Sequence, residues 1–118
     1  MFKTSEKITY VHGLSDSEKN DMKAYLQGLV HGFCKQNQSR RFFLRDLLGG
    51  TNLYWQKTPM FKLYKRQLDA GKTHSPAFNQ AAKDAGKILK WVLDIDKREF
   101  IVHHGWRLSY EWTLAEYN

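Results

Sequence analysis

Five histidines and one cysteine are the residues of this chain that could bind a transition metal or act as a nucleophile. His31 and Cys34 lie three residues apart, a spacing that places two ligands on one face of a helix. Two ligands do not complete a zinc site, and no HExxH or CxxC pattern supplies the others. His103 and His104 are adjacent, and adjacent side chains of a strand point to opposite faces. The sequence therefore predicts no metal site and no bound cofactor.

Covalent or acid–base catalysis needs a nucleophile, a base and an orienting group within reach of one another. The Cys34–His31 pair has no third member that the sequence singles out. Asp94 and Asp96 could act as paired carboxylates, but their position favours the end of a helix and the turn that follows it. Gly49-Gly50 lacks the lysine and hydroxyl of a nucleotide-binding loop. We therefore predict that the chain is not an enzyme.

Length and composition predict one domain over residues 1–118, because a chain of this size with 42% hydrophobic residues can bury a core without staples. A single cysteine fits a reducing compartment. We expect that the first residues do not form a signal peptide, and no stretch approaches the roughly 18 apolar residues of a membrane span. We expect a cytoplasmic protein with no membrane partner.

Positive charge is the most informative compositional feature. The formal net charge is +7. Residues 35–107 contain fifteen lysines and arginines against six acidic residues, whereas residues 1–34 are balanced and residues 108–118 are acidic. A basic segment favours an acidic partner, and nucleic acid is the commonest one. A merely solvated basic surface is the alternative.

Capping signals and apolar spacing predict the elements that carry this charge. Ser15 and Glu18 form a capping-box pattern before a run of apolar residues at spacings of three and four. Thr58-Pro59 and Ser75-Pro76 are typical helix starts, and Gly71 ends the first of these helices. The predicted elements are a helix over 16–35, an extended piece at 42–44, a short helical turn ended by Gly49-Gly50, a helix from Thr58-Pro59 to Gly71 and a helix over 76–93.

Two alternating runs around Gly105 predict an antiparallel β-hairpin at the end of the chain. Its second strand should bury one face against the helices, with Arg107 pointing the other way. The buried face is expected to consist of Trp106, Leu108, Tyr110 and Trp112. Residues 1–14 are expected to form an N-terminal arm or an edge strand, and residues 15–113 the core.

The predicted order is helix, short strand, helix, helix and hairpin, an α+β pattern with three to four helices. In this order, in the two capped helices across the Gly71–Ser75 turn and in the terminal hairpin, residues 16–113 resemble the winged helix-turn-helix family. The long connection over residues 49–58 departs from that pattern. The resemblance implies that the helix before the hairpin enters the major groove of duplex DNA and that the hairpin is a wing.

The helix over 76–93 supplies an independent indication of the same function. Lys83, Lys87 and Lys90 are spaced by four and three, so they share one stripe, and Asp84 and Asp94 only partly offset their charge. Lysines supply charge for phosphates, whereas the amides of Asn79 and Gln80 are of the type that reads adenine. Other candidate contacts lie on the preceding helix and near the hairpin turn: Lys62, Lys65, Arg66, His103 and Arg107.

These observations predict a nucleic-acid-binding domain that favours duplex DNA, either a transcriptional regulator or an accessory factor. A homodimer is compatible with this prediction, because one such domain makes a modest footprint. Two alternatives stay open. One is a small protein-interaction module of the phage or mobile-element type, an inhibitor or adaptor that uses the aromatics of residues 53–55 and of the hairpin as anchors. The other is an RNA-binding protein.

Overall fold

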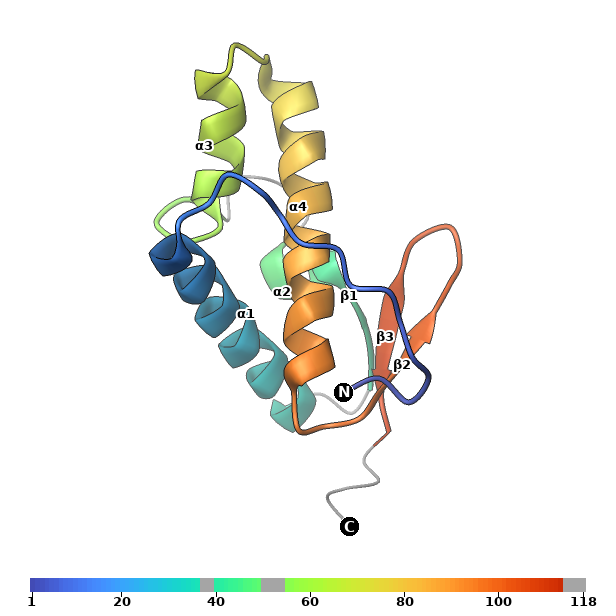
Figure 1. Cartoon of the computed structure of the whole chain (residues 1–118). Helices are drawn as coiled ribbons and strands as arrows, with labels where there is room; N and C mark the ends of the chain where they lie inside the picture. Colours follow the sequence, from blue (N-terminus) through green and yellow to red (C-terminus); the bar gives the residue numbers. More distant parts are fainter. Residues whose placement is uncertain (37–39, 50–54, 114–118) are drawn as a thin grey trace.

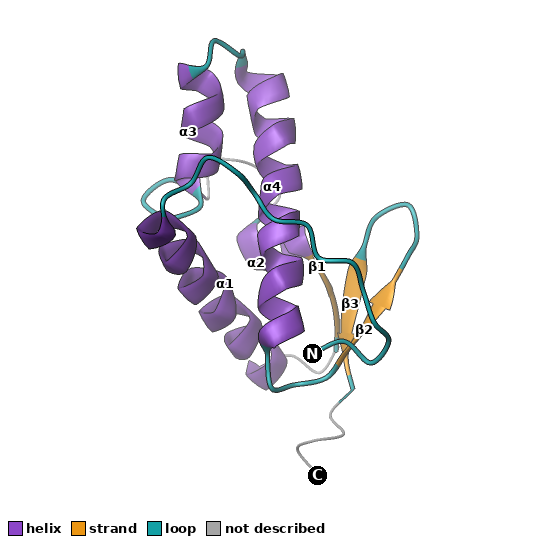
Figure 2. Cartoon of the chain, viewed as in Figure 1, coloured by secondary structure: helices purple, strands orange, loops and turns teal. Residues whose placement is uncertain are grey.

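A computed structural model describes residues 1–36, 40–49 and 55–113 of the chain. Three antiparallel strands form one sheet in the order β1-β3-β2 (Figures 1 and 2). The α+β class, the four helices of the described residues and the C-terminal hairpin confirm the predicted fold, and the layout is compatible with a winged-helix arrangement. The elements are α1 (Asp16–Gln36), β1 (Arg41–Phe43), α2 (Leu44–Leu48), α3 (Phe61–Asp69), α4 (His74–Ile95), β2 (Phe100–His103) and β3 (Ser109–Trp112).

The N-terminus of α1 has the capping box that the sequence predicts. The Ser15 hydroxyl accepts a hydrogen bond from the Glu18 amide at 3.1 Å, and the Glu18 carboxylate accepts one from the Ser15 amide at 2.9 Å. The Ser15 amide is the main cause that lowers the pKa of Glu18, and Lys62 adds to it. Behind this cap, Met22, Leu26 and Val30 recur every fourth residue and are buried in the core.

The long helix α4 lies at the centre of the fold, packed against α1, α2 and α3. It begins at His74, two residues before the predicted start, because Pro76 then falls in the first turn, where backbone amides have no intrahelical acceptor. One side of the helix, which includes Ala81 and Ile88, is buried in the core. The buried residues of α4 are Ala77, Ala81, Asp84, Ala85, Ile88, Leu89, Val92 and Leu93.

The start of α3 corrects the sequence prediction. The helix begins at Phe61, because Thr58 closes a turn before it: its hydroxyl donates to the Trp55 carbonyl at 2.6 Å and accepts from the Met60 amide at 3.2 Å. Trp55 is buried, as expected of an anchor, whereas Leu53 and Tyr54 lie outside the described residues. The helix ends at Asp69, just before Gly71, whose φ of +96° favours glycine.

An ion pair between Arg66 and Asp84 joins α3 to α4 inside the fold. The guanidinium and carboxylate are 2.8 Å apart, with only 19% and 5% of the two side chains exposed. Gln80 donates a second hydrogen bond to Asp84 at 3.0 Å. The expectation that Asp84 offsets lysine charge on the surface is therefore wrong. Its position borders the buried side of α4, where Arg66 can reach it from α3.

The sheet buries one aromatic face against the helices. Phe42 pairs with Tyr110, and Phe100 pairs with Trp112. Phe42, Phe100 and Tyr110 are almost fully buried, and burial raises the pKa of Tyr110 to about 12, with a further contribution from Glu6. The predicted burial of Tyr110 is confirmed, and Trp112 is half-buried.

The hairpin tip contradicts the prediction for Trp106 and Leu108. Strand β2 ends at His103 and β3 begins at Ser109, so both residues belong to the connection between the strands. Trp106 is 93% exposed and Leu108 is 41% exposed. The alternation of side chains between two faces holds only within a paired strand, and the sequence pattern continues past the point where pairing ends.

The N-terminal residues extend the edge of the sheet and then cross the helices. Phe2 forms a parallel bridge with Phe100, whose amide and carbonyl bond to Met1 and Lys3. Residues 4–13, which we call the strap, then pass over α4 and lead to the start of α1 (Figure 1). No helix in the described ranges is long and apolar enough to cross a membrane.

The Arg66–Asp84 pair generates a stability prediction. Replacing Asp84 with alanine leaves a largely buried guanidinium without its counter-charge, and we expect the free energy of unfolding to fall by about 3 kcal/mol. Asp94→Ala is the matched control, because it removes an exposed aspartate from the same helix. Urea titrations of both variants measure the difference. Equal, small losses would show that the pair contributes little.

Candidate nucleic-acid interface

The three stripe lysines of α4 differ in how accessible they are. Lys83 is exposed, Lys87 is half-buried, and the Lys90 side chain is only 17% exposed. Within the described part of the chain, neither Lys83 nor Lys87 has an acidic partner. The stripe that the sequence predicts therefore provides two lysines to an external anion, not three.

Lys90 is held by the strap. The Glu6 carboxylate lies 3.3 Å from the Lys90 ammonium and 3.3 Å from His104 Nε2 at the start of the hairpin tip. Only 14% of the Glu6 side chain is exposed, so solvent screens its contact with Lys90 weakly. One carboxylate thus joins the strap, α4 and the hairpin, and it neutralises the lysine nearest to the sheet.

Aromatic contacts fix the strap over the outer face of α4. The Tyr10 ring meets the Trp91 ring edge to face, with 5.1 Å between centroids, and the Lys23 ammonium lies 3.9 Å from the centre of the Trp91 ring. Val11, which belongs to the strap, is buried. The strap therefore covers the stretch of α4 around Ile88–Trp91, with Lys87 at its edge, and the part of the outer face that stays open lies toward the N-terminal end of the helix (Figure 1).

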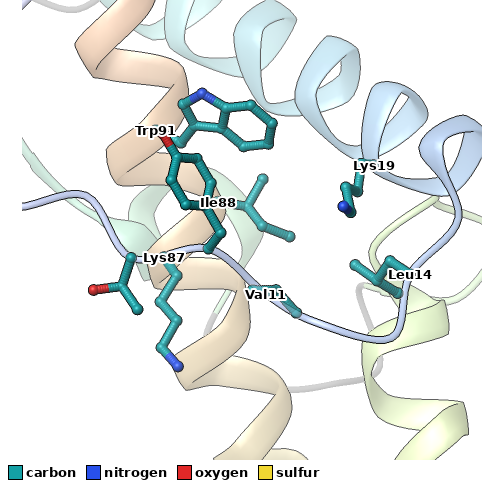
Figure 3. Close-up of a pocket in the computed structure, with 8 residues that line it drawn as sticks. Val11, Leu14, Lys19, Lys87, Ile88 and Trp91 are labelled. Atoms are coloured by element: carbon teal, nitrogen blue, oxygen red, sulfur yellow. The ribbon is translucent and has the colours of Figure 1, made fainter.

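A small cavity lies where the strap meets α1 and α4 (Figure 3). Val11, Leu14, Ile88 and Trp91 supply much of its apolar lining, and Lys19 and Lys87 border it. Its volume is about 70 Å³, enough for a few water molecules but too small for a nucleobase. The cavity therefore is not a ligand pocket of the size that nucleotide recognition needs.

The other predicted contacts on the helices are placed as follows. Lys62 pairs with Glu18 at 3.5 Å and Lys65 pairs with Asp69 at 3.3 Å, both on the surface, where such pairs are weak and a phosphate can compete. Arg66 is committed to its buried partner.

The two candidate amides of α4 also differ. Asn79 is exposed and accessible to a ligand. The Gln80 amide donates to Asp84, so it is already used within the fold.

The hairpin tip presents an aromatic ring and a guanidinium, those of Trp106 and Arg107, to solvent. Arg107 is exposed, and its guanidinium carbon lies 5.0 Å from the centre of the Trp106 ring. His103, in contrast, is 2.8 Å from Glu111. Trp106 was absent from the predicted nucleic-acid contacts because the alternation placed it on the buried face, and only the protein-interaction alternative used the hairpin aromatics. The adjacent Gly105 was the available signal, since glycine marks turns.

The residues that could have bound a metal or acted in catalysis, Cys34, His31 and Asp96, make contacts within the fold. Cys34 is buried, and burial is the main cause that raises the pKa of its thiol. Arg98 donates to His31 Nδ1 at 3.1 Å. Asp96 follows the last residue of α4 and accepts hydrogen bonds from Gln27 and from the Arg98 amide. No cluster of three or more metal-ligating side chains occurs among the described residues.

Comparisons of the chain with protein-family models, with curated proteins and with solved structures returned no match. The function therefore has to be argued from the geometry and charge of the interface itself.

The contact between Glu6 and Lys90 generates a second prediction. In a double-mutant cycle of Glu6→Gln and Lys90→Gln, we expect a coupling free energy of about 1 kcal/mol, because both side chains are mostly buried. The exposed pair Lys65–Asp69 is the control, with a coupling of at most about 0.5 kcal/mol. Urea unfolding of the four proteins in each cycle gives both values. A coupling near zero for Glu6 and Lys90 would show that the strap does not hold this lysine.

Proposed function

We propose that this domain binds nucleic acid, with duplex DNA as the favoured form, through the open part of the outer face of α4 and the hairpin tip. The observation that carries the proposal is the cationic set Lys83, Lys87 and Arg107. These residues have no acidic partner among the described residues, and they lie on the two elements that a winged-helix layout presents to DNA. Such a domain would serve as a transcriptional regulator or an accessory factor.

The two parts of this interface adjoin each other. Glu6 contacts both Lys90 on α4 and His104 at the base of the tip, so a single side chain spans the gap between the helix and the hairpin. A ligand that extends from the open part of α4 toward the sheet therefore crosses the strap and then meets the hairpin. Cations spread over two adjoining elements suit an extended polyanion better than a small acidic molecule.

The available side chains favour contacts with the sugar–phosphate backbone. Lysine and arginine bind phosphate through charge, which positions a protein on DNA without reading its sequence. Of the two amides predicted to read adenine, only Asn79 is free of an internal hydrogen bond among the described residues. Direct base readout is thus limited to Asn79 and to whatever the hairpin tip contacts.

A protein-interaction module is the second candidate function, and one observation favours it. Trp106 is almost fully exposed, and tryptophan is the residue type most enriched at the energetic centres of protein interfaces. The neighbouring Arg107 suits an acidic partner surface as well as a phosphate. RNA differs from DNA in its 2′-hydroxyl groups and in the groove shape of its duplex, and competition between the two distinguishes them.

Substitution of the open lysines tests the proposal. We expect Lys83→Ala/Lys87→Ala to lower affinity for mixed-sequence duplex DNA and to flatten the slope of log K against log salt by about 1.8, which is about 0.9 for each lost phosphate contact. Fluorescence anisotropy across a salt series measures the slope.

The control variant Lys35→Ala/Lys97→Ala removes the same charge from two exposed positions, one in the last turn of α1 and one two residues after the end of α4. This control should keep the wild-type slope. If both double variants change the slope equally, binding follows net charge and not this interface. If the wild-type protein does not bind DNA or RNA at low salt, the proposed function is wrong.

A further inference from the structure

The exposure of Trp106 is unusual for its residue type. Tryptophan is among the more deeply buried residues on average, and the remaining described tryptophans, Trp55, Trp91 and Trp112, are buried or half-buried. Trp106 is 93% exposed at the end of the hairpin, where its ring contacts the guanidinium of Arg107. A ring this exposed contributes little to the core, so its faces are available to a partner.

Contacts hold the residues on both sides of the hairpin tip. His103 is tied to Glu111 across the strands at 2.8 Å, and His104 is tied to Glu6 on the strap at 3.3 Å. On the other side of the tip, Ser109 is fully buried and its hydroxyl accepts a hydrogen bond from Arg41 at 2.9 Å. The connection between the two strands therefore starts and ends at anchored residues.

The chemistry of the pair matches a nucleotide. An exposed indole offers a flat π surface on which any nucleobase can stack, and the adjacent guanidinium can bind the phosphate of the same or the next nucleotide. Inside a duplex, both faces of each base are covered by its neighbours. A base presents a free face only where it is unpaired, at an end, or at a step that a wedge has opened.

We propose that Trp106 is a stacking residue for an unpaired nucleobase, so that the preferred ligand is DNA in which duplex adjoins unpaired nucleotides. This inference rests on the proposed function and names the form of nucleic acid that the same interface selects. The outer face of α4 binds the duplex backbone, and the tip reaches the unpaired base. Arg107 beside the ring favours a nucleotide over an apolar protein surface, because burying its charge in a protein interface would need an acidic partner.

The test compares two DNA probes of the same duplex sequence, one fully paired and one with a short single-stranded gap. We expect wild-type protein to bind the gapped probe more tightly. Trp106→Ala should lose about 5-fold to 150-fold in affinity for the gapped probe, the range expected for one stacked base, and should bind the paired probe like wild type. The affinity of Trp106→Phe for the gapped probe should lie between those of wild type and Trp106→Ala, because phenylalanine keeps an aromatic face.

A second readout uses the tryptophan itself. Stacking of a base on Trp106 should quench the emission of this exposed indole when the gapped probe is added, and Trp106→Phe should abolish that quenching. Because the residue is exposed, thermal unfolding should be unchanged in both variants, which separates loss of binding from loss of fold.

The outcomes separate the two proposals. If wild type binds both probes equally and Trp106→Ala does not alter either affinity, the stacking role is wrong while the proposed function stands, and the tip serves another contact such as a protein partner. Equal losses on both probes would also overturn it, because they would show a general contact and no selection of unpaired bases. If wild type binds neither probe, both proposals fail.

Discussion

The ion pair between Arg66 and Asp84 is the interaction on which the rest of the structure depends. Its carboxylate is buried, so the packing of α3 against α4 requires the counter-charge that Arg66 supplies. The same guanidinium donates a hydrogen bond to the His12 carbonyl at 2.8 Å, where the strap turns at Gly13 with a φ of +82°. Arg66 therefore joins three segments that are distant in the sequence.

This pair also fixes which side of α4 faces outward. Asp84 and its neighbour Ala85 are both buried, so Lys83, which lies about 100° before Asp84 and about 200° before Ala85 around the helix, faces the exterior. The strap then crosses that exterior at Trp91, where Tyr10 packs against the indole ring. Glu6 of the strap pairs with Lys90, so this lysine is not available to an external anion. The division of the lysine stripe into an open part and a covered part is thus a consequence of internal packing, and the hairpin is tied to the same point through His104.

The elements that sequence reasoning predicted well are those set by local interactions. Ser15 and Glu18 satisfy backbone groups within one turn, and the alternation around Tyr110 follows from the geometry of a paired strand. Asp84, in contrast, looked like one more surface charge, because nothing near it in the sequence announces a partner eighteen residues earlier. Trp106 was misplaced for a related reason: where pairing stops is decided by the register between β2 and β3, and the pattern of residue types does not reveal it.

In the candidate interface too, the features set by local geometry were predicted and those set by contacts between remote segments were not. The spacing of Lys83, Lys87 and Lys90 predicts a shared stripe correctly, since it depends only on helix geometry. That Lys90 lies under the strap and that Gln80 is engaged internally depends on contacts between remote segments, which a single sequence does not encode in any simple pattern. The open charge is consequently smaller and more localised than the composition implies.

Lysine footprinting tests the central claim, nucleic-acid binding at this particular surface, most directly. Acetylation of each lysine would be measured by mass spectrometry in free protein and at saturating DNA. We expect DNA to protect Lys83 and Lys87, to leave Lys35 and Lys97 as reactive as in the free protein, and to change Lys90 little, because the strap already shields it. Protection confined to Lys35 and Lys97, or uniform protection of all exposed lysines, would contradict this claim.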